Sequence, residues 1–265
     1  MMSLVRPLLF CALGLWALHA FTAHAADENT TVYADSRNLT AISDALFKKG
    51  VLSTDDPAAV EEYIRIHYCG LYEQYGMDDF AWNRIRETQA RDLDLRLASF
   101  PDGMEVASAL HISQYDMGVN QFLIATRDQM DNMGLVTLYN NDAGSVSPCL
   151  GGDYSSFVPR VHPLQLVVRL DKPISLTGIP MSRANADELI NFLNKRPGTE
   201  DRKREITLVM RVRITGVDPL AGVTDKLRRT VLGHLDEILI YEGPERKNLL
   251  YKKDLRIQPD GKSKS

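Results

Sequence analysis

The chain has few cysteines, no excess of positive charge and none of the short motifs that mark common enzyme classes. It has 3 cysteines in 265 residues, and 31 lysines and arginines stand against 35 aspartates and glutamates, for a formal net charge of −4. A mildly acidic chain disfavours general nucleic-acid binding, which needs clustered positive charge. G-x-S-x-G, P-loop and glycine-rich dinucleotide motifs are all absent from the sequence. We therefore expect no nucleic-acid partner and no cofactor.

Long hydrophobic runs are absent beyond the first 25 residues. Residues 8–21 form an apolar run behind Arg6, and Ala23-His24-Ala25 follows it, which is the pattern of a secretory signal peptide with an A-x-A cleavage site. The run is shorter than the roughly 20 residues that a bilayer span needs. We expect cleavage after Ala25 and a soluble mature chain that begins at Ala26 and has no membrane span.

The scarcity of cysteine indicates the compartment to which the chain is exported. Cleavage of the signal peptide removes Cys11 and leaves Cys69 and Cys149. In an exported protein an even pair of cysteines is expected to form a disulfide. So low a cysteine content fits the periplasm of a Gram-negative bacterium better than eukaryotic secretion. We predict a periplasmic protein with a disulfide between Cys69 and Cys149.

The mature chain begins with a helical layer over residues 26–100. Asn38 or Ser36, Asp56 before Pro57, and Asp78 are start signals, because a short polar side chain caps the free amides of a first turn. Apolar residues at spacings of three and four follow each signal. Three helices are expected, over 38–49, 57–75 and 78–100.

From residue 104 to residue 256 the pattern changes to alternation, which is typical of strands. It is most regular in 206–214, where every second residue is apolar. One helical segment, 187–196, interrupts the strands. The sequence predicts a single α+β domain over 26–265, with helices packed on a mainly antiparallel twisted sheet or open barrel, one further helix between C-terminal strands and a disordered tail at 257–265.

The residues that could carry chemistry do not assemble into a motif. The four histidines of the mature chain show no metal-ligand spacing, so no metal site is expected; they are His67, His111, His162 and His234. Acidic pairs occur at Asp55-Asp56, Asp78-Asp79 and Asp92-x-Asp94, and a hydrolase of glycans would need two carboxylates across a cleft. The first two pairs also stand at predicted helix starts, where acids cap amides and favour the helix dipole. No catalytic residue is assigned.

Three arginines are the candidates for binding a partner. Arg169, Arg211 and Arg213 are predicted on the polar side of neighbouring strands, where their guanidinium groups would suit an anionic ligand or an acidic protein surface. The alternative is that they pair across strands with acids, namely Asp171, Asp236 or Glu237. Both interpretations remain open at this stage.

One stretch of the chain resembles a known family. The run Asp78-Asp-Phe-Ala-Trp-Asn-Arg-Ile-Arg86, behind Glu62-Tyr63 and Cys69-x-x-Tyr72, resembles an exported bacterial family of unknown function. The resemblance covers the helical third and implies no reaction, cofactor or partner. The leading hypothesis is a non-enzymatic periplasmic binding or envelope-assembly factor whose partner is an envelope protein or an anionic ligand. The alternatives are a hydrolase of an envelope polymer that uses carboxylates, and a carrier of a small molecule or lipid.

Overall fold

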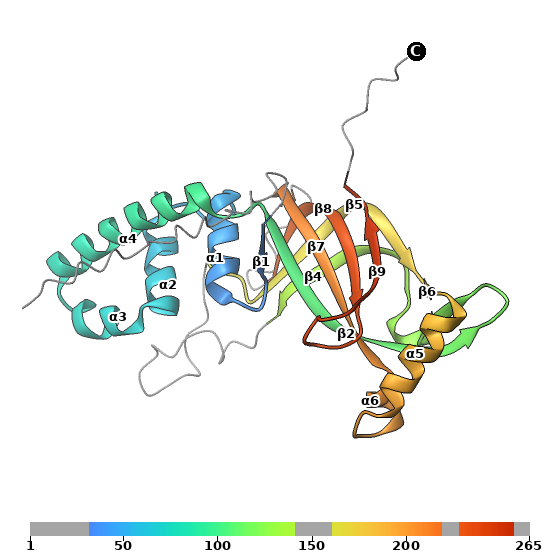
Figure 1. The fold of residues 1–265 in the computed structure, drawn as a ribbon. Coiled ribbons are helices and arrows are strands. Elements are labelled where there is room, and N and C mark those ends of the chain that lie inside the picture. Colours follow the sequence, from blue (N-terminus) through green and yellow to red (C-terminus); the bar gives the residue numbers. More distant parts are fainter. Residues whose placement is uncertain (1–31, 141–160, 219–227, 257–265) are drawn as a thin grey trace, which may run out of the picture. The chain divides into compact units, whose positions relative to one another are not determined.

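The computed structural model describes residues 32–140, 161–218 and 228–256 (Figure 1). The predicted signal peptide, Cys149 and the predicted tail lie outside these residues. The described residues belong to a compact unit that spans Thr31–Ser265. They form an α+β fold in which helices accompany a curled nine-stranded sheet, a half-barrel, so the predicted fold class is confirmed.

The helices of the N-terminal layer begin where the sequence predicts, because their capping residues act locally. The amide of Thr40 donates to Asn38 Oδ1 at 2.9 Å, and the amide of Ala58 donates to Asp56 Oδ1 at 2.9 Å. Asp78 caps the longest helix in the same way. The helices are α1 (Leu39–Lys48), α2 (Pro57–His67), α3 (Cys69–Tyr75) and α4 (Asp79–Ser99).

The prediction of one continuous helix over 57–75 is wrong. The chain leaves the helical conformation at Tyr68 (φ −132°, ψ 50°) and separates α2 from α3. The break turns α3 so that Leu71 and Tyr75 pack against a buried cluster of Val60 and Ile64 from α2 and Trp82 from α4. Tertiary packing thus overrides a helical pattern that continues through the break.

The sheet is mixed, with antiparallel pairs in the majority. Its main path runs β4-β5-β8-β7-β2-β3-β6; β1 pairs with β2, and β9 pairs with β8. The pairs β1–β2 and β5–β8 are parallel, and the others are antiparallel. The strands are β1 (Tyr33–Asp35), β2 (Gly103–Asp116), β3 (Gln121–Ile124), β4 (Met130–Asn140), β5 (Gln165–Leu176), β6 (Gly178–Pro180), β7 (Glu205–Val217), β8 (Arg228–Tyr241) and β9 (Leu249–Asp254).

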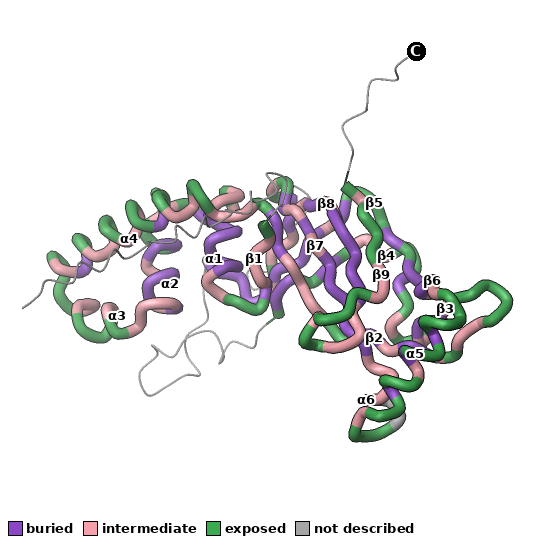
Figure 2. Tube along the Cα trace, viewed as in Figure 1, coloured by how far each residue is buried: buried purple, intermediate pink, exposed green. Residues whose placement is uncertain are grey.

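Strand β7 is central, and its alternating pattern is realised as predicted. It pairs with β2 on one side and β8 on the other. Its apolar residues face the main core, which appears as the buried part of the strands in Figure 2; they are Ile206, Leu208, Met210, Val212 and Ile214. The same core includes Ile42 and Leu46 of α1 and Tyr63 of α2, which joins the helical layer to the sheet.

Between β6 and β7 the chain forms α5 (Arg183–Asn194) and α6 (Glu200–Lys203). The helix predicted over 187–196 therefore starts earlier and ends earlier than expected. It starts at its cap, because Ser182 Oγ accepts a hydrogen bond from the amide of Asn185 at 3.3 Å. Leu189 and Leu193 are buried, as the spacing of apolar residues indicates.

Candidate functional site: a groove between helices α3 and α4

Helix α4 is long but only partly covered. Of its 21 residues only Trp82 and Leu93 are buried. Trp82 anchors the helix, because its ring meets that of Tyr72 edge to face at 5.4 Å and its Nε1 donates to Glu61 at 3.5 Å. A helix held along one narrow line leaves most of its surface available for contact with other molecules.

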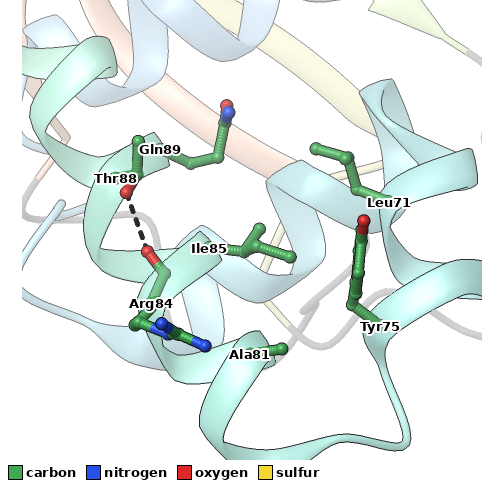
Figure 3. Close-up of a pocket in the computed structure, with 7 residues that line it drawn as sticks. All are labelled: Leu71, Tyr75, Ala81, Arg84, Ile85, Thr88 and Gln89. Carbon is green, nitrogen blue, oxygen red and sulfur yellow. Dashed lines mark hydrogen bonds between the residues drawn. The ribbon is translucent and has the colours of Figure 1, made fainter.

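Beside this line of contact lies a groove with a volume of about 470 Å³ (Figure 3). Leu71 and Tyr75 project from α3, and Ile85 projects toward them from α4 (Figure 3). The full lining is Leu71, Tyr75, Ala81, Arg84, Ile85, Thr88 and Gln89. The groove is therefore mainly apolar, and Arg84 is the one charged residue among those that line it.

Two apolar side chains near the groove residues in sequence stand in solvent, Met77 in the turn between α3 and α4 and Phe80 in the first turn of α4. Met77 is 98% exposed and Phe80 is 84% exposed. Asp78 fixes the turn, because its Oδ1 accepts hydrogen bonds from the amides of Phe80 at 3.1 Å and Ala81 at 3.0 Å. Large apolar side chains that gather at a surface beside an apolar groove commonly mark an interaction site.

A buried polar cluster joins α1 and α2 to the segment that precedes β5. Ser43 Oγ is 2.8 Å from His67 Nε2 and 2.7 Å from His162 Nε2. His162 Nδ1 is 3.1 Å from the carbonyl of Pro163, so Nδ1 carries the proton and Nε2 is left as an acceptor beside the Ser43 hydroxyl, which also donates to the carbonyl of Leu39 at 3.0 Å. The Glu62 carboxylate accepts the backbone amide of His162 at 2.8 Å, which joins α2 to the segment that leads into β5.

Burial determines the protonation of this cluster. Loss of solvation lowers the pKa of His162 to about 4 and, together with the positive potential of His162 and Arg96, lowers that of His67 to about 3. Ser43 and His162 are 0% and 1% exposed. Because no substrate can reach the Ser43 hydroxyl in this arrangement, we interpret the serine–histidine contact as a structural tie.

The acids considered for hydrolysis are mostly placed at helix starts, and Asp55 borders a hollow that Glu87 also lines. Asp56 and Asp78 are occupied as helix caps, and the exposed Asp79 stands in the first turn of α4. Within residues 32–140, 161–218 and 228–256, no three histidine, cysteine or acidic side chains gather as metal ligands.

The three arginines predicted to bind a partner are engaged in ion pairs. Arg211 contacts Glu237 at 2.8 Å and Arg213 contacts Asp236 at 2.9 Å, as the cross-strand alternative predicts. Arg169 pairs with Asp218 at 2.7 Å rather than with Asp171. The strip as a recognition surface stays a prediction. So does the disulfide, since Cys69 opens α3 but Cys149 lies outside the described residues.

The sequence does not identify the groove. The aromatic cluster that includes Tyr75 and Phe80 suggests a ligand platform, but its helical spacing favours core packing, whereas the structure leaves Phe80 84% exposed. The signal that could have found the groove is Met77 and Phe80, two large apolar residues on either side of the cap pair Asp78-Asp79. Neither lies on the buried stripe of a helix that starts at Asp78.

Comparison with known proteins agrees with the resemblance seen in the sequence. Residues 55–195 match the model of a domain of unknown function (DUF4852), and this match covers more than half of the 265 residues. All residues that line the groove fall within it. No curated protein and no solved structure matches the chain. The chain belongs to the family defined by this domain of unknown function, DUF4852.

Proposed function

We propose that the protein is a non-enzymatic binding factor of the cell envelope, and that it holds a partner protein in the groove between α3 and α4. The observations that carry this proposal are the mainly apolar groove between α3 and α4 and the exposure of Met77 and Phe80, which stand next to its lining residues in the sequence. Apolar side chains at such exposure lower the free energy of association when a partner covers them, by roughly 25 cal/mol for each Å² removed from water.

The chemistry around the groove favours a protein over the other classes of ligand. Asp78 and Asp79 lie between Met77 and Phe80 in the sequence, and their carboxylates would be repelled by an anionic lipid surface. A carrier of a small molecule buries most of its ligand, whereas this groove is open to solvent along α4. A hydrolase needs two carboxylates that converge on one bond, and no carboxylate lines the groove.

Site-specific photo-crosslinking in producing cells tests the proposal. A photoreactive residue at Gln89, inside the groove, is expected to yield an adduct with another protein. Phe80→Glu should remove the adduct, because a charge replaces an apolar contact. Met117→Glu is the matched control, since Met117 is an apolar residue of similar size, 65% exposed and located in the turn between β2 and β3. An adduct that survives Phe80→Glu, or that Met117→Glu removes equally, would argue against the groove.

Export to the periplasm is part of the proposal and is supported by the apolar run 8–21 and the Ala23-His24-Ala25 pattern. Among the described residues, no helix combines the length and apolar character that a membrane crossing requires. Intact-mass analysis of a periplasmic extract should show a chain that begins at Ala26. A full-length mass in the membrane fraction would contradict cleavage and export.

A further inference from the structure

The groove contains one charged group, and its surroundings restrict the chemistry of what can bind there. Arg84 is exposed and lines the groove, and Figure 3 shows its guanidinium group directed along α4 toward Ala81. Within the part of the chain that the structure describes, no acidic side chain comes within ion-pair distance of Arg84. Glu87, three positions further along α4, forms no ion pair with Arg84 and borders a separate hollow.

The exposed apolar residues define the length of the surface. Phe80, Arg84, Thr88 and Leu95 follow one another at helical spacing and share one face of α4. Phe80 at one end is 84% exposed and Leu95 at the other end is 76% exposed. They are 15 positions apart, which in an α-helix corresponds to about 22 Å. A straight helix of about the same length can contact both ends and place side chains in the groove between them.

A second copy of this chain is a less suitable occupant. Contact between two copies through Met77 and Phe80 would bring Asp78 and Asp79 of both copies to the same place, where their charges repel. A helical segment of another protein can extend from Phe80 to Leu95 without placing acids at that end of α4.

On this basis we propose that the occupant is an amphipathic helix of another envelope protein, with apolar side chains toward Leu71, Tyr75 and Ile85 and a carboxylate that pairs with Arg84. An apolar helix face that enters a groove between two helices is a common mode of peptide recognition. The guanidinium group offers two parallel donors, which a carboxylate matches in a bidentate contact. The inference rests on the proposed function and adds the secondary structure and the charge of the partner.

The test uses the full chain with the photoreactive residue at Gln89 and compares substitutions of Arg84. Arg84→Glu should lower the adduct yield about tenfold or more, because it sets two like charges against each other in the contact. Arg84→Lys keeps the charge and should retain most of the yield. Arg183→Glu is the control, since Arg183 is an exposed arginine in the first turn of α5. Melting temperatures should be alike in all variants, because Arg84 makes no ion pair among the described residues.

Sequencing of the crosslinked peptide completes the test. The expected result is a segment with helical apolar spacing and an aspartate or glutamate, and replacing that acid by lysine should restore the adduct in Arg84→Glu. If Phe80→Glu removes the adduct but Arg84→Glu does not, the acidic helix is refuted and the groove remains a protein-binding site. An adduct with a second copy of the chain, or with a segment that lacks an acid, also refutes it. No adduct in any variant would overturn both proposals.

Discussion

His162→Gln would separate the contribution of a buried histidine to acid sensitivity from its contribution to packing. In the folded protein the imidazole is 1% exposed, and burial lowers its pKa to about 4. In the unfolded chain the pKa of histidine is about 6.5. Below about pH 6.5 the unfolded chain therefore binds a proton that the folded protein does not bind, and the free energy of unfolding falls.

The magnitude follows from these two values of the pKa. At about pH 5 the pH lies about 1.5 units below the pKa of the unfolded histidine and still above that of the buried one. Since each unit corresponds to about 1.4 kcal/mol, the free energy of unfolding falls by about 2 kcal/mol between about pH 7.5 and about pH 5. The loss is complete only below about pH 4, where the folded protein also becomes protonated. Above about pH 7 the group has no effect on the pH dependence, because it is neutral in both states.

Urea denaturation at several pH values measures the effect. His162→Gln keeps an acceptor for the Ser43 hydroxyl but does not titrate, so its stability should fall about 2 kcal/mol less than that of the natural protein on going to pH 5. Ser43→Ala is the control, because it removes a hydrogen bond and leaves the buried imidazole in place. It should lower stability at every pH by about 1 kcal/mol with an unchanged slope.

Two results would refute this reasoning. Parallel pH profiles for the natural protein and His162→Gln would show that the imidazole is not held neutral by burial. An NMR titration that places the pKa of His162 near 6.5 in the folded protein would show the same directly. His67 keeps its own contribution in the variant, and because its pKa is lowered further, to about 3, a residual dependence on pH of about the same size is expected.

Three further predictions concern residues outside this cluster. Asp78→Ala should lower the free energy of unfolding by about 1 kcal/mol through loss of the cap of α4, and Asp78→Asn should restore most of it; equal stability of both variants would contradict the capping role. Arg211→Glu with Arg213→Glu should destabilise the fold by about 3 kcal/mol or more, because the facing carboxylates are buried; an unchanged melting temperature would instead favour the strip as a recognition surface. Thiol labelling of denatured, non-reduced protein should detect neither Cys69 nor Cys149, and two labelled thiols would exclude the disulfide.

Features that depend on neighbouring residues could be predicted from the sequence. The caps of α1, α2 and α4 form between side chains and amides two or three positions away, so Asn38, Asp56 and Asp78 carry the information themselves. The alternation of β7 likewise identifies its buried face, because side chains of a strand point alternately to its two sides. The α+β class follows from such local patterns taken together.

Features that join distant parts of the chain were decided only by the tertiary structure. The break at Tyr68, the parallel pairing of β5 with β8 and the contact of Ser43 with His162 each depend on packing between segments with no shared local pattern. The same holds for the groove, which exists because α3 turns back against α4. Hydrogen bonds and spacing within one segment can be read from the sequence, whereas the arrangement of segments depends on how all their buried faces fit together.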